Sequence, residues 1–190
     1  MHPDFHRAAY DIWLGVALFW LAMWARSSRA ARIQTWGSRL TQAIPTLAGY
    51  MLLFTHFPRY GPLFWSLAPA TAFYAWAGLF LTLLGALLAI WARVCLGRNW
   101  SSMVTVKRDH QLIRSGPYKW VRHPIYSGLL LAALGTAIVV GDLRALLGFG
   151  LLVAAFAMKF HLEESMMTEQ FGSEYVEYKR RVKALVPFVI

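Results

Sequence analysis

Two groups of polar residues in this sequence stand beside strongly apolar runs, and both contain side chains that can bind charged ligands. In the first group, within residues 116–128, Arg122, His123 and Tyr126 stand where a basic segment meets an apolar one. The second group follows two apolar runs later and consists of Lys159, His161, Glu163 and Glu164. Arginine, histidine and tyrosine are unfavourable at a membrane mouth unless they have a role, so the first group predicts a functional site.

The residue types of the two groups predict binding of an organic ion that carries both signs of charge. Pro124 suits the first turn of a helix, and a helix start with free backbone amides beside the His123 imidazole suits a carboxylate. Glu163 and Glu164 suit a cation. No metal site is expected, because His161 with either glutamate lacks further ligands. The motifs of nucleophile elbows, phosphate loops and zinc proteases are absent from the sequence.

Each of these residues also has a simpler interpretation when it is taken alone. Arg122 and Lys119 fit the snorkelling anchors of a membrane protein, and Tyr118 and Tyr126 fit its interfacial aromatic belt. The combination of these residues at one helix start favours a site over a set of separate anchors.

The composition predicts an all-α integral membrane protein with about five transmembrane helices. The chain of 190 residues is 58% hydrophobic and 15% charged, and it contains nine tryptophans, a balance that does not fit a soluble surface. The apolar segments run over about residues 9–25, 43–57, 69–92, 124–140 and 143–160. Several are shorter than the roughly 20 residues that cross a bilayer comfortably. The first is interpreted as a retained helix, because it lacks the small-residue cleavage site of a signal peptide.

Lysines and arginines are distributed unequally between the two predicted sides of the membrane. Of the 19, only Arg7, Arg59 and Arg144 fall on one side, and the other 16 fall on the opposite side. This bias predicts an outer N-terminus and a cytoplasmic C-terminus, so both polar groups face the cytoplasm. It also accounts for the net charge of +10 without nucleic-acid binding, since no nucleic-acid motif accompanies the charge.

The last two apolar segments are predicted to form a helical hairpin around Asp142. An antiparallel pairing sets His123 opposite His161, to within about one helical turn. The same pairing brings Glu163 and Glu164 within reach of His123 and its neighbours. The two polar groups are therefore predicted to form one site.

Three local patterns predict the surroundings of this hairpin. Gly78 and Gly85 lie on nearly one face of the third segment and predict a close contact with another helix. Within residues 99–116, the valines and the later Leu-Ile pair predict a short extended hairpin, which either caps a pocket or simply connects two spans. Gly172 and Ser173 predict a helix stop followed by a new N-cap and a helix at the membrane surface.

Five ordered motifs resemble the isoprenylcysteine carboxyl methyltransferase family and the membrane phospholipid methyltransferases grouped with it. The motifs are His110-Gln111-Leu112-Ile113, Gly116-Pro117-Tyr118, Arg122-His123-Pro124-Ile125-Tyr126-Ser127-Gly128, Glu163-Glu164, and the blocks within residues 171–187. The resemblance covers about residues 97–188. The N-terminal segments match the family only in general character.

The resemblance implies an enzyme that uses S-adenosylmethionine as its methyl donor. The cofactor would lie in a cytoplasmic pocket formed by the last two spans, the preceding loop and a C-terminal interfacial helix. Residues that would line the adenosine end are His110, Gln111, Leu112 and Ile113, with Tyr118 beside them. Residues that would hold the methionine portion are His123, Pro124, Ile125 and Tyr126, with Glu163 reaching the cofactor from the fifth span. The chain then divides into three N-terminal spans, residues 1–96, and a cofactor-binding core, residues 97–190.

Lys159 departs from the family pattern, because the eukaryotic enzymes have an arginine four residues before the glutamate. A lysine offers a point charge instead of a bidentate fork for a carboxylate. The expected acceptor is a lipophilic or prenylated molecule that enters from the bilayer, and a phospholipid or small thiol also remains open. The expected catalytic residues are Lys159, Glu163, Glu164 and Arg122. For an amine or thiol acceptor, a glutamate of this set, His123 or His161 is available as the proton acceptor.

Three other functions remain open on the sequence. A phospholipid N-methyltransferase would use the same cofactor site, a sterol-type reductase would use NADPH, and a membrane scaffold would bind neither cofactor. The sterol reductases have a related Arg-His-x-Asn-Tyr block. Ile125 stands in place of its asparagine, and Gly128 follows where an acidic residue would be expected, which favours methyl transfer.

Overall fold

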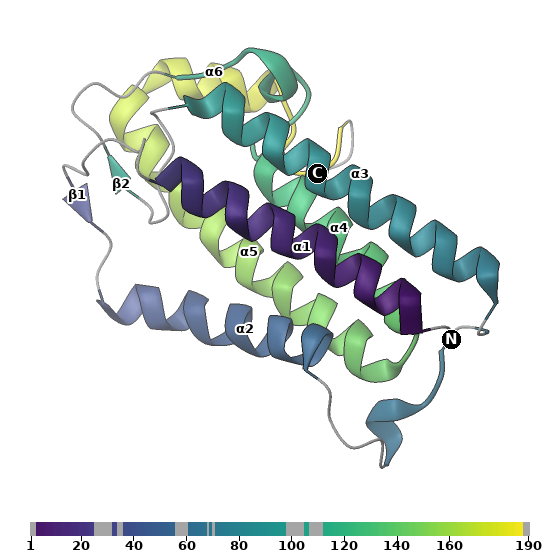
Figure 1. Cartoon of the computed structure of the whole chain (residues 1–190). Helices are drawn as coiled ribbons and strands as arrows, with labels where there is room; N and C mark the ends of the chain where they lie inside the picture. The colour runs from purple at the N-terminus through teal and green to yellow at the C-terminus, as the bar shows by residue number, and fades with distance from the viewer. Residues whose placement is uncertain are drawn as a thin grey trace.

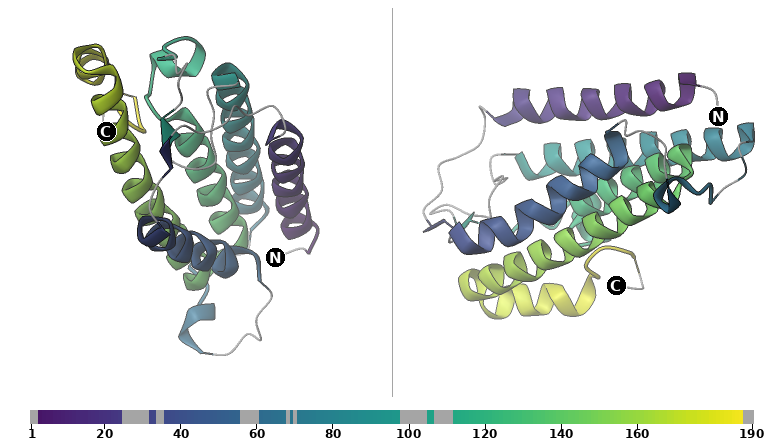
Figure 2. Two further views of the ribbon diagram at one scale, coloured as in Figure 1. Left: turned by 90° about the vertical axis from the view of Figure 1, so that its left-hand side faces the viewer. Right: turned by 90° about the horizontal axis from the view of Figure 1, so that it is seen from below.

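The chain folds into a bundle of long helices with a short helix packed at one end (Figures 1 and 2). This computed structural model describes residues 3–24, 32–33, 36–55, 61–67, 69, 71–97, 105–106 and 112–187. The helices are α1 (Pro3–Trp24), α2 (Trp36–Phe54), α3 (Ala72–Leu96), α4 (Pro124–Val140), α5 (Leu143–Phe171) and α6 (Ser173–Arg181). Short elements are the 3-10 turns η1 (Pro62–Phe64) and η3 (Gly116–Lys119) and the strands β1 (Arg32–Ile33) and β2 (Thr105–Val106).

Each of the five predicted apolar segments overlaps a helix, which confirms the helical fold class. Among the described residues, α3 and α5 are the two helices long and apolar enough to cross a membrane. Shorter apolar stretches cover Leu40–Phe54 and Pro124–Val140. The predicted start of the second segment is wrong, because α2 begins at Trp36 and continues through Pro45. The last segment is longer than predicted, because α5 continues to Phe171 through the polar residues of the second group.

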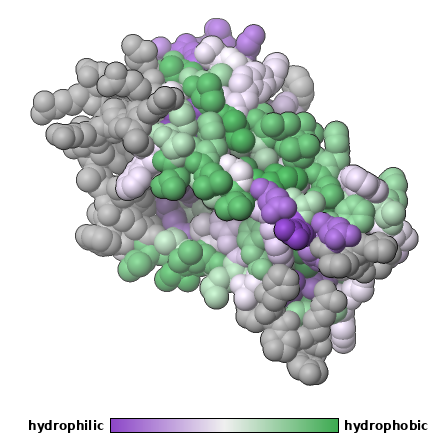
Figure 3. All heavy atoms as spheres, in the orientation of Figure 1, coloured by the Kyte–Doolittle hydropathy of each residue, from purple (hydrophilic) through white to green (hydrophobic). Residues whose placement is uncertain are grey.

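Many large apolar side chains lie on the outside of the bundle. On α3, Phe73, Trp76 and Phe80 are exposed, and on α1 Leu14 and Leu18 are exposed as well. Figure 3 shows hydrophobic residues over the middle of one face, while hydrophilic residues gather near α6 and over the first turns of α1. Exposed apolar area of this extent marks a surface that contacts lipid or another protein. It fits the membrane character that the composition predicts.

Helices α3 and α4 meet along a seam of small residues. A Cβ placed on Gly85 would lie 2.3 Å from the backbone nitrogen of Ala132 and 2.5 Å from the carbonyl oxygen of Gly128. Further along, a Cβ on Gly78 would lie 2.7 Å from the carbonyl oxygen of Gly135. The two backbones approach this closely because glycine has no side chain. The helix contact predicted from Gly78 and Gly85 is therefore confirmed.

The tight turn between α4 and α5 confirms the predicted hairpin. Gly141 adopts the left-handed conformation with φ of 72°, which glycine tolerates without strain. Asp142 then caps α5, because its carboxylate accepts a hydrogen bond from the backbone N–H of Ala145 at 2.9 Å. The amide of Leu67 also donates to the carbonyl of Gly141 at 2.9 Å, which ties the turn to the segment that follows η1.

At the end of the bundle opposite the α4–α5 turn, two details differ from the predictions. Strand β2 pairs with β1 in antiparallel register, Arg32 opposite Val106, so the predicted local hairpin with the Leu-Ile pair is wrong. Leu112 and Ile113 lie outside any regular element. The predicted break after α5 is correct, but Gly172, with φ of 55°, is the residue that precedes α6, and Ser173 is already inside the helix.

Candidate functional site

The two polar groups meet where α4 begins and α5 nears its end. The Tyr126 hydroxyl donates to Glu163 Oε1 at 2.5 Å. The other oxygen of the same carboxylate, Glu163 Oε2, lies 3.6 Å from His123 Nδ1. These contacts join the first turn of α4 to α5 and bring together residues far apart in sequence. The single site predicted from the hairpin register is therefore formed, with Glu163 as the partner of His123.

Glu164 is the centre of a second set of contacts and is only 6% exposed. Arg122 donates from Nε to Glu164 Oε1 at 2.7 Å, and its Nη2 lies 2.5 Å from the same oxygen. The Lys179 ammonium of α6 lies 2.9 Å from Glu164 Oε2, and His123 Nε2 lies 3.3 Å from Oε1. The carboxylate is thus surrounded by three basic side chains, as a buried charge requires.

His123 therefore lies between two carboxylates, one at each ring nitrogen. Burial lowers the pKa of His123, but the hydrogen bonds and charges of Glu163 and Glu164 raise it by more, so the net pKa lies above its ordinary value. Its ring also stacks on Tyr126, with centroids 5.6 Å apart and planes inclined by 14°. The imidazole is therefore held in place between two carboxylates, which favour its protonated form.

The raised pKa of His123 predicts how stability depends on pH. Below the unfolded-state value of about 6.5 the stabilisation from protonated His123 is fully present, and it is lost as pH rises through the folded-state pKa. A His123→Gln variant should therefore be destabilised most in mildly acidic solution. The difference in unfolding free energy between wild type and variant should narrow as pH rises from the unfolded-state value through the folded-state pKa of His123, as denaturant titrations in detergent would measure.

His161 provides the matched control for this pH dependence. Its side chain is exposed and lies against Phe160 at a ring distance of 4.3 Å. The His161→Gln variant should change the free energy of unfolding by less than about 0.5 kcal/mol, because its side chain is exposed. A difference for His123→Gln that widened with rising pH would contradict the charge state assigned to His123.

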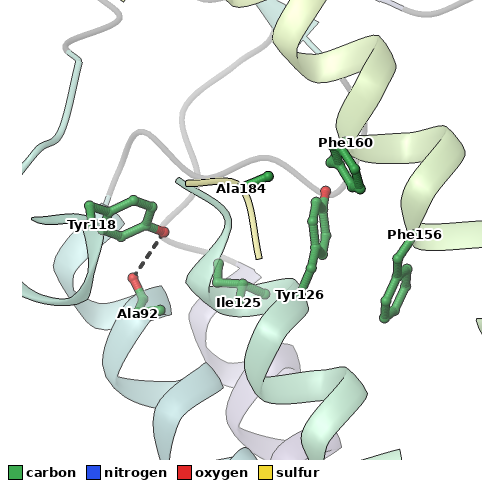
Figure 4. Close-up of a cluster of buried hydrophobic side chains, with 7 residues drawn as sticks. All are labelled: Ala92, Tyr118, Ile125, Tyr126, Phe156, Phe160 and Ala184. Atoms are coloured by element: carbon green, nitrogen blue, oxygen red, sulfur yellow. Dashed lines mark hydrogen bonds between the residues drawn. The ribbon is translucent and has the colours of Figure 1, made fainter. Parts of the chain in front are cut away.

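Aromatic side chains line the apolar side of the site (Figure 4). Tyr126 stacks on Phe156 with ring centroids 5.2 Å apart, and Phe160 lies 5.5 Å from the His123 ring. These α5 residues belong to one buried cluster with Tyr118, Ile125 and Ala184. The cluster excludes water from one side of the polar network, so the interactions there are stronger than they would be at the surface.

The segment after α6 runs back across the start of α4 and is held by main-chain hydrogen bonds. The amides of Arg122 and His123 donate to the carbonyls of Lys183 and Ala184 at 2.8 and 3.0 Å. The Ser127 hydroxyl donates to the Leu185 carbonyl at 2.6 Å. The Arg122 guanidinium adds hydrogen bonds to the carbonyls of Lys179 and Val182. The end of the chain is therefore part of the site.

Helix α6 is anchored to η3 through two tyrosines. The Tyr178 hydroxyl donates to the Tyr118 carbonyl at 2.6 Å, and the Tyr118 hydroxyl donates in turn to the Ala92 carbonyl of α3 at 3.3 Å. Burial raises the pKa of Tyr178 to about 12, so its hydroxyl remains a donor at neutral pH. This chain of contacts connects α6, η3 and α3 around the site.

The remaining predicted residues fall in three places. Pro124 is buried at the start of α4, and Ile113 packs against the aromatic cluster. Leu112 is half-buried beside it in sequence. Lys159 lies on α5 one turn before Glu163, with Nζ 5.6 Å from the centroid of the Tyr126 ring. His110 and Gln111 lie outside the residues that the structure describes.

Comparisons with known proteins match the part of the chain that contains His123, Tyr126, Glu163 and Glu164. The family model described as the isoprenylcysteine carboxyl methyltransferase (ICMT) family matches residues 76–169. Over these residues, just under half of the chain, the sequence is similar to this family. Protein-S-isoprenylcysteine O-methyltransferase B of Arabidopsis thaliana is 35% identical over 115 residues, which are 59% of this chain and 58% of the relative. The Schizosaccharomyces pombe protein-S-isoprenylcysteine O-methyltransferase is 35% identical over 109 residues, 56% of this chain and 46% of the relative.

The fold agrees with that of a solved member of the methyltransferase family. The structure described as the eukaryotic intramembrane Ras methyltransferase ICMT superposes with a TM-score of 0.53 at 24% sequence identity. The match covers 83% of this chain and 55% of that chain. This chain spans about half the length of the relatives named above.

Sequence reasoning missed some residues that complete the polar network around His123 and Glu164. A preference for basic residues near a helix C-terminus would alone explain Lys179 in the last turn of α6, but Lys179 forms an ion pair with Glu164. The carbonyls of residues 182–185 were not expected to bind the start of α4. The signal in the sequence was the family resemblance of the blocks within residues 171–187, because no local pattern explains the position of residues 182–185.

Proposed function

We propose that this chain is an S-adenosylmethionine-dependent membrane methyltransferase that methylates a lipophilic acceptor, a prenylated cysteine carboxylate being the first candidate. One observation carries the proposal. Tyr126, Glu163 and His123 form a buried, charged and aromatic network inside the segment that is similar to the isoprenylcysteine carboxyl methyltransferase family. Relatives of that segment are named protein-S-isoprenylcysteine O-methyltransferases.

The side chains of the site suit the proposed cofactor by their charge. S-Adenosylmethionine supplies a methyl group on a positively charged sulfur, which leaves without acid catalysis. Glu163 offers a carboxylate to the ammonium group of the methionine portion. The imidazolium of His123 and the free amides at the start of α4 offer positive charge and donors to its carboxylate. The faces of Tyr118 and Tyr126 favour a nearby cation.

We assign the reaction itself mainly to alignment and exclusion of water. Lys159 orients an anionic acceptor, and Glu163 aligns the reacting end of the site. Arg122 and Glu164 hold His123 and the last segment of the chain in position, and the aromatic cluster keeps water away. Because a carboxylate acceptor carries its own lone pair and no proton, this arrangement needs no general base. Positioning of this kind is a major source of rate enhancement.

The proposal extends to the membrane arrangement and the division of the chain. All five long helices are taken to cross the bilayer, with the N-terminus outside and the site at the cytoplasmic face, as the charge distribution favours. Residues 97–190 are taken to hold the cofactor, with residues 110–113 at its adenosine end, and residues 1–96 to support them. The acceptor's apolar tail is taken to enter from the lipid.

The test is a methyl-transfer assay with the full chain reconstituted in vesicles. Transfer of labelled methyl from S-adenosylmethionine to a farnesylated cysteine derivative is expected, with far less transfer to phosphatidylethanolamine. Transfer only to phosphatidylethanolamine would mean that the acceptor is a phospholipid, while the proposed cofactor would stand. Calorimetric titration that detected NADPH but not S-adenosylmethionine would reject the enzyme class.

Two variants test the assigned site. Tyr126→Phe removes the hydrogen bond to Glu163 and should weaken S-adenosylmethionine binding by about tenfold, because a hydrogen bond to a charged group contributes roughly 1.5 kcal/mol. Tyr74→Phe, on the outer part of α3, is the matched control and should bind with unchanged affinity. If wild type and Tyr126→Phe bound S-adenosylmethionine with equal affinity, the placement of Glu163 in the site would be contradicted, even if the enzyme remained active.

A further inference from the structure

A basic surface lies at the α6 end of the bundle, and its side chains are not part of the polar network of the site. It consists of the exposed side chains of Lys119, Arg180, Arg181 and Lys183. The side chains of Arg180 and Arg181 are each 76% exposed. Lys119 belongs to η3, whereas Arg180 and Arg181 end α6 and Lys183 follows it. The bridge between Val121 and Lys183 brings these two segments side by side, so they contribute to one positively charged surface.

The charge of this surface is only partly balanced by nearby carboxylates. Glu177 is shared by two arginines, at 2.6 Å from Arg181 Nη2 and 4.0 Å from Arg180 Nη1. Lys119 and Lys183 form no ion pair within the described part of the chain. Lys179 is different, because its ammonium is committed to Glu164 inside the site. The surface therefore keeps a net positive charge that faces outward.

An exposed tryptophan stands beside this charge. Trp120, which follows Lys119, is 55% exposed and contacts Trp91 of α3 at a ring distance of 5.6 Å. Trp91 is itself exposed and lies in the last turns of an apolar helix long enough to cross a membrane. Tryptophans at this position are typical of the boundary between lipid chains and headgroups. The basic surface thus continues directly from the apolar side of the bundle.

We propose that the basic surface binds anionic lipid headgroups. These headgroups belong to the membrane leaflet that surrounds Trp91 and Trp120. Positive charge attracts such headgroups, and each lysine or arginine near a membrane surface adds to the attraction. The adjoining tryptophans distinguish a lipid surface from a soluble polyanion, because a soluble partner makes no use of a neighbouring apolar belt. The proposal concerns lipid contact and does not depend on the methyltransferase activity.

The test compares lipid binding by the full chain in neutral detergent. The protein is titrated with phosphatidylglycerol or phosphatidylcholine, and bound lipid is counted by native mass spectrometry. The wild-type protein should bind phosphatidylglycerol at least about tenfold more tightly than phosphatidylcholine. The variant Arg180→Gln/Arg181→Gln/Lys183→Gln should lose most of this preference. Arg7→Gln, an exposed arginine at the other end of the bundle, should retain it.

A second variant changes the preference in the opposite direction. Glu177→Gln removes the carboxylate that competes for Arg180 and Arg181, so it should bind phosphatidylglycerol severalfold more tightly than wild type. Such a gain does not arise from misfolding. Equal binding of the two lipids by wild type, an unchanged preference in the triple variant, or displacement of phosphatidylglycerol by a short RNA at equal charge concentration would overturn the proposal.

Discussion

Replacing Glu164 with alanine is expected to lower the free energy of unfolding by about 3–5 kcal/mol, the usual result of removing one partner from a buried ion pair. The substitution leaves the Arg122 guanidinium buried without its carboxylate, and it also removes the partner of Lys179. It further lowers the positive shift of the His123 pKa, which Glu164 helps to produce. Chemical denaturation in detergent, followed by circular dichroism, would measure the loss.

Glu177→Ala is the matched control for this prediction. Glu177 also contacts two arginines, but its side chain is 47% exposed, so its loss should change the unfolding free energy by less than about 1 kcal/mol. A Glu164→Gln/Arg122→Met double variant should be less destabilised than Glu164→Ala, because no unpaired guanidinium remains. Similar losses for Glu164→Ala and Glu177→Ala would contradict the assignment of Glu164 as the buried centre.

Replacing Gly85 with leucine is expected to destabilise the fold by at least about 3 kcal/mol, at the upper end of overpacking effects. The first added carbon would already lie 2.3 Å from backbone nitrogen of Ala132. Backbone has no alternative rotamer, so α3 and α4 would have to separate along the whole seam. The expected readout is a large drop in melting temperature and a loss of the cofactor binding proposed for the adjoining site.

Gly150→Leu is the control for the seam. Gly150 is also a helical glycine, but a Cβ there has no atom within 4 Å outside its own helix. Leucine favours a helix by roughly 0.8 kcal/mol more than glycine, so this variant should keep or slightly raise the melting temperature. If the two leucine variants melted at the same temperature, the seam would not contribute to stability.

Helices and their pairing were predictable where a local pattern carried the information. The apolar runs around Gly141 and Asp142 are long, and a short polar break between two such runs favours an antiparallel pair, so the meeting of His123 with the glutamates followed from counting residues. Gly78 and Gly85 marked the close face of α3 for a similar reason, since small residues at helical spacing have few other roles in an apolar helix.

The remaining features depend on contacts between distant segments that have no local pattern. Nothing in the periodicity of residues 182–185 indicates that their carbonyls bind the amides at the start of α4. Strand β1 is only two residues long, which is too short to show alternation. Lys179 satisfied the helix-dipole preference equally well on a solvated helix, so its ion pair with Glu164 required the three-dimensional arrangement.

The seam between α3 and α4 also limits where a lipophilic molecule can travel. At Gly85 and Gly128, a single added methyl group would already meet backbone atoms of the facing helix. An alkyl chain is therefore too wide to pass between α3 and α4 there. Any route for an acceptor's tail from the bilayer into the interior must therefore run past other helix pairs, with α3 and α4 as the fixed boundary. Mobility measurements on labelled helices should find α3 and α4 moving together as one body during turnover.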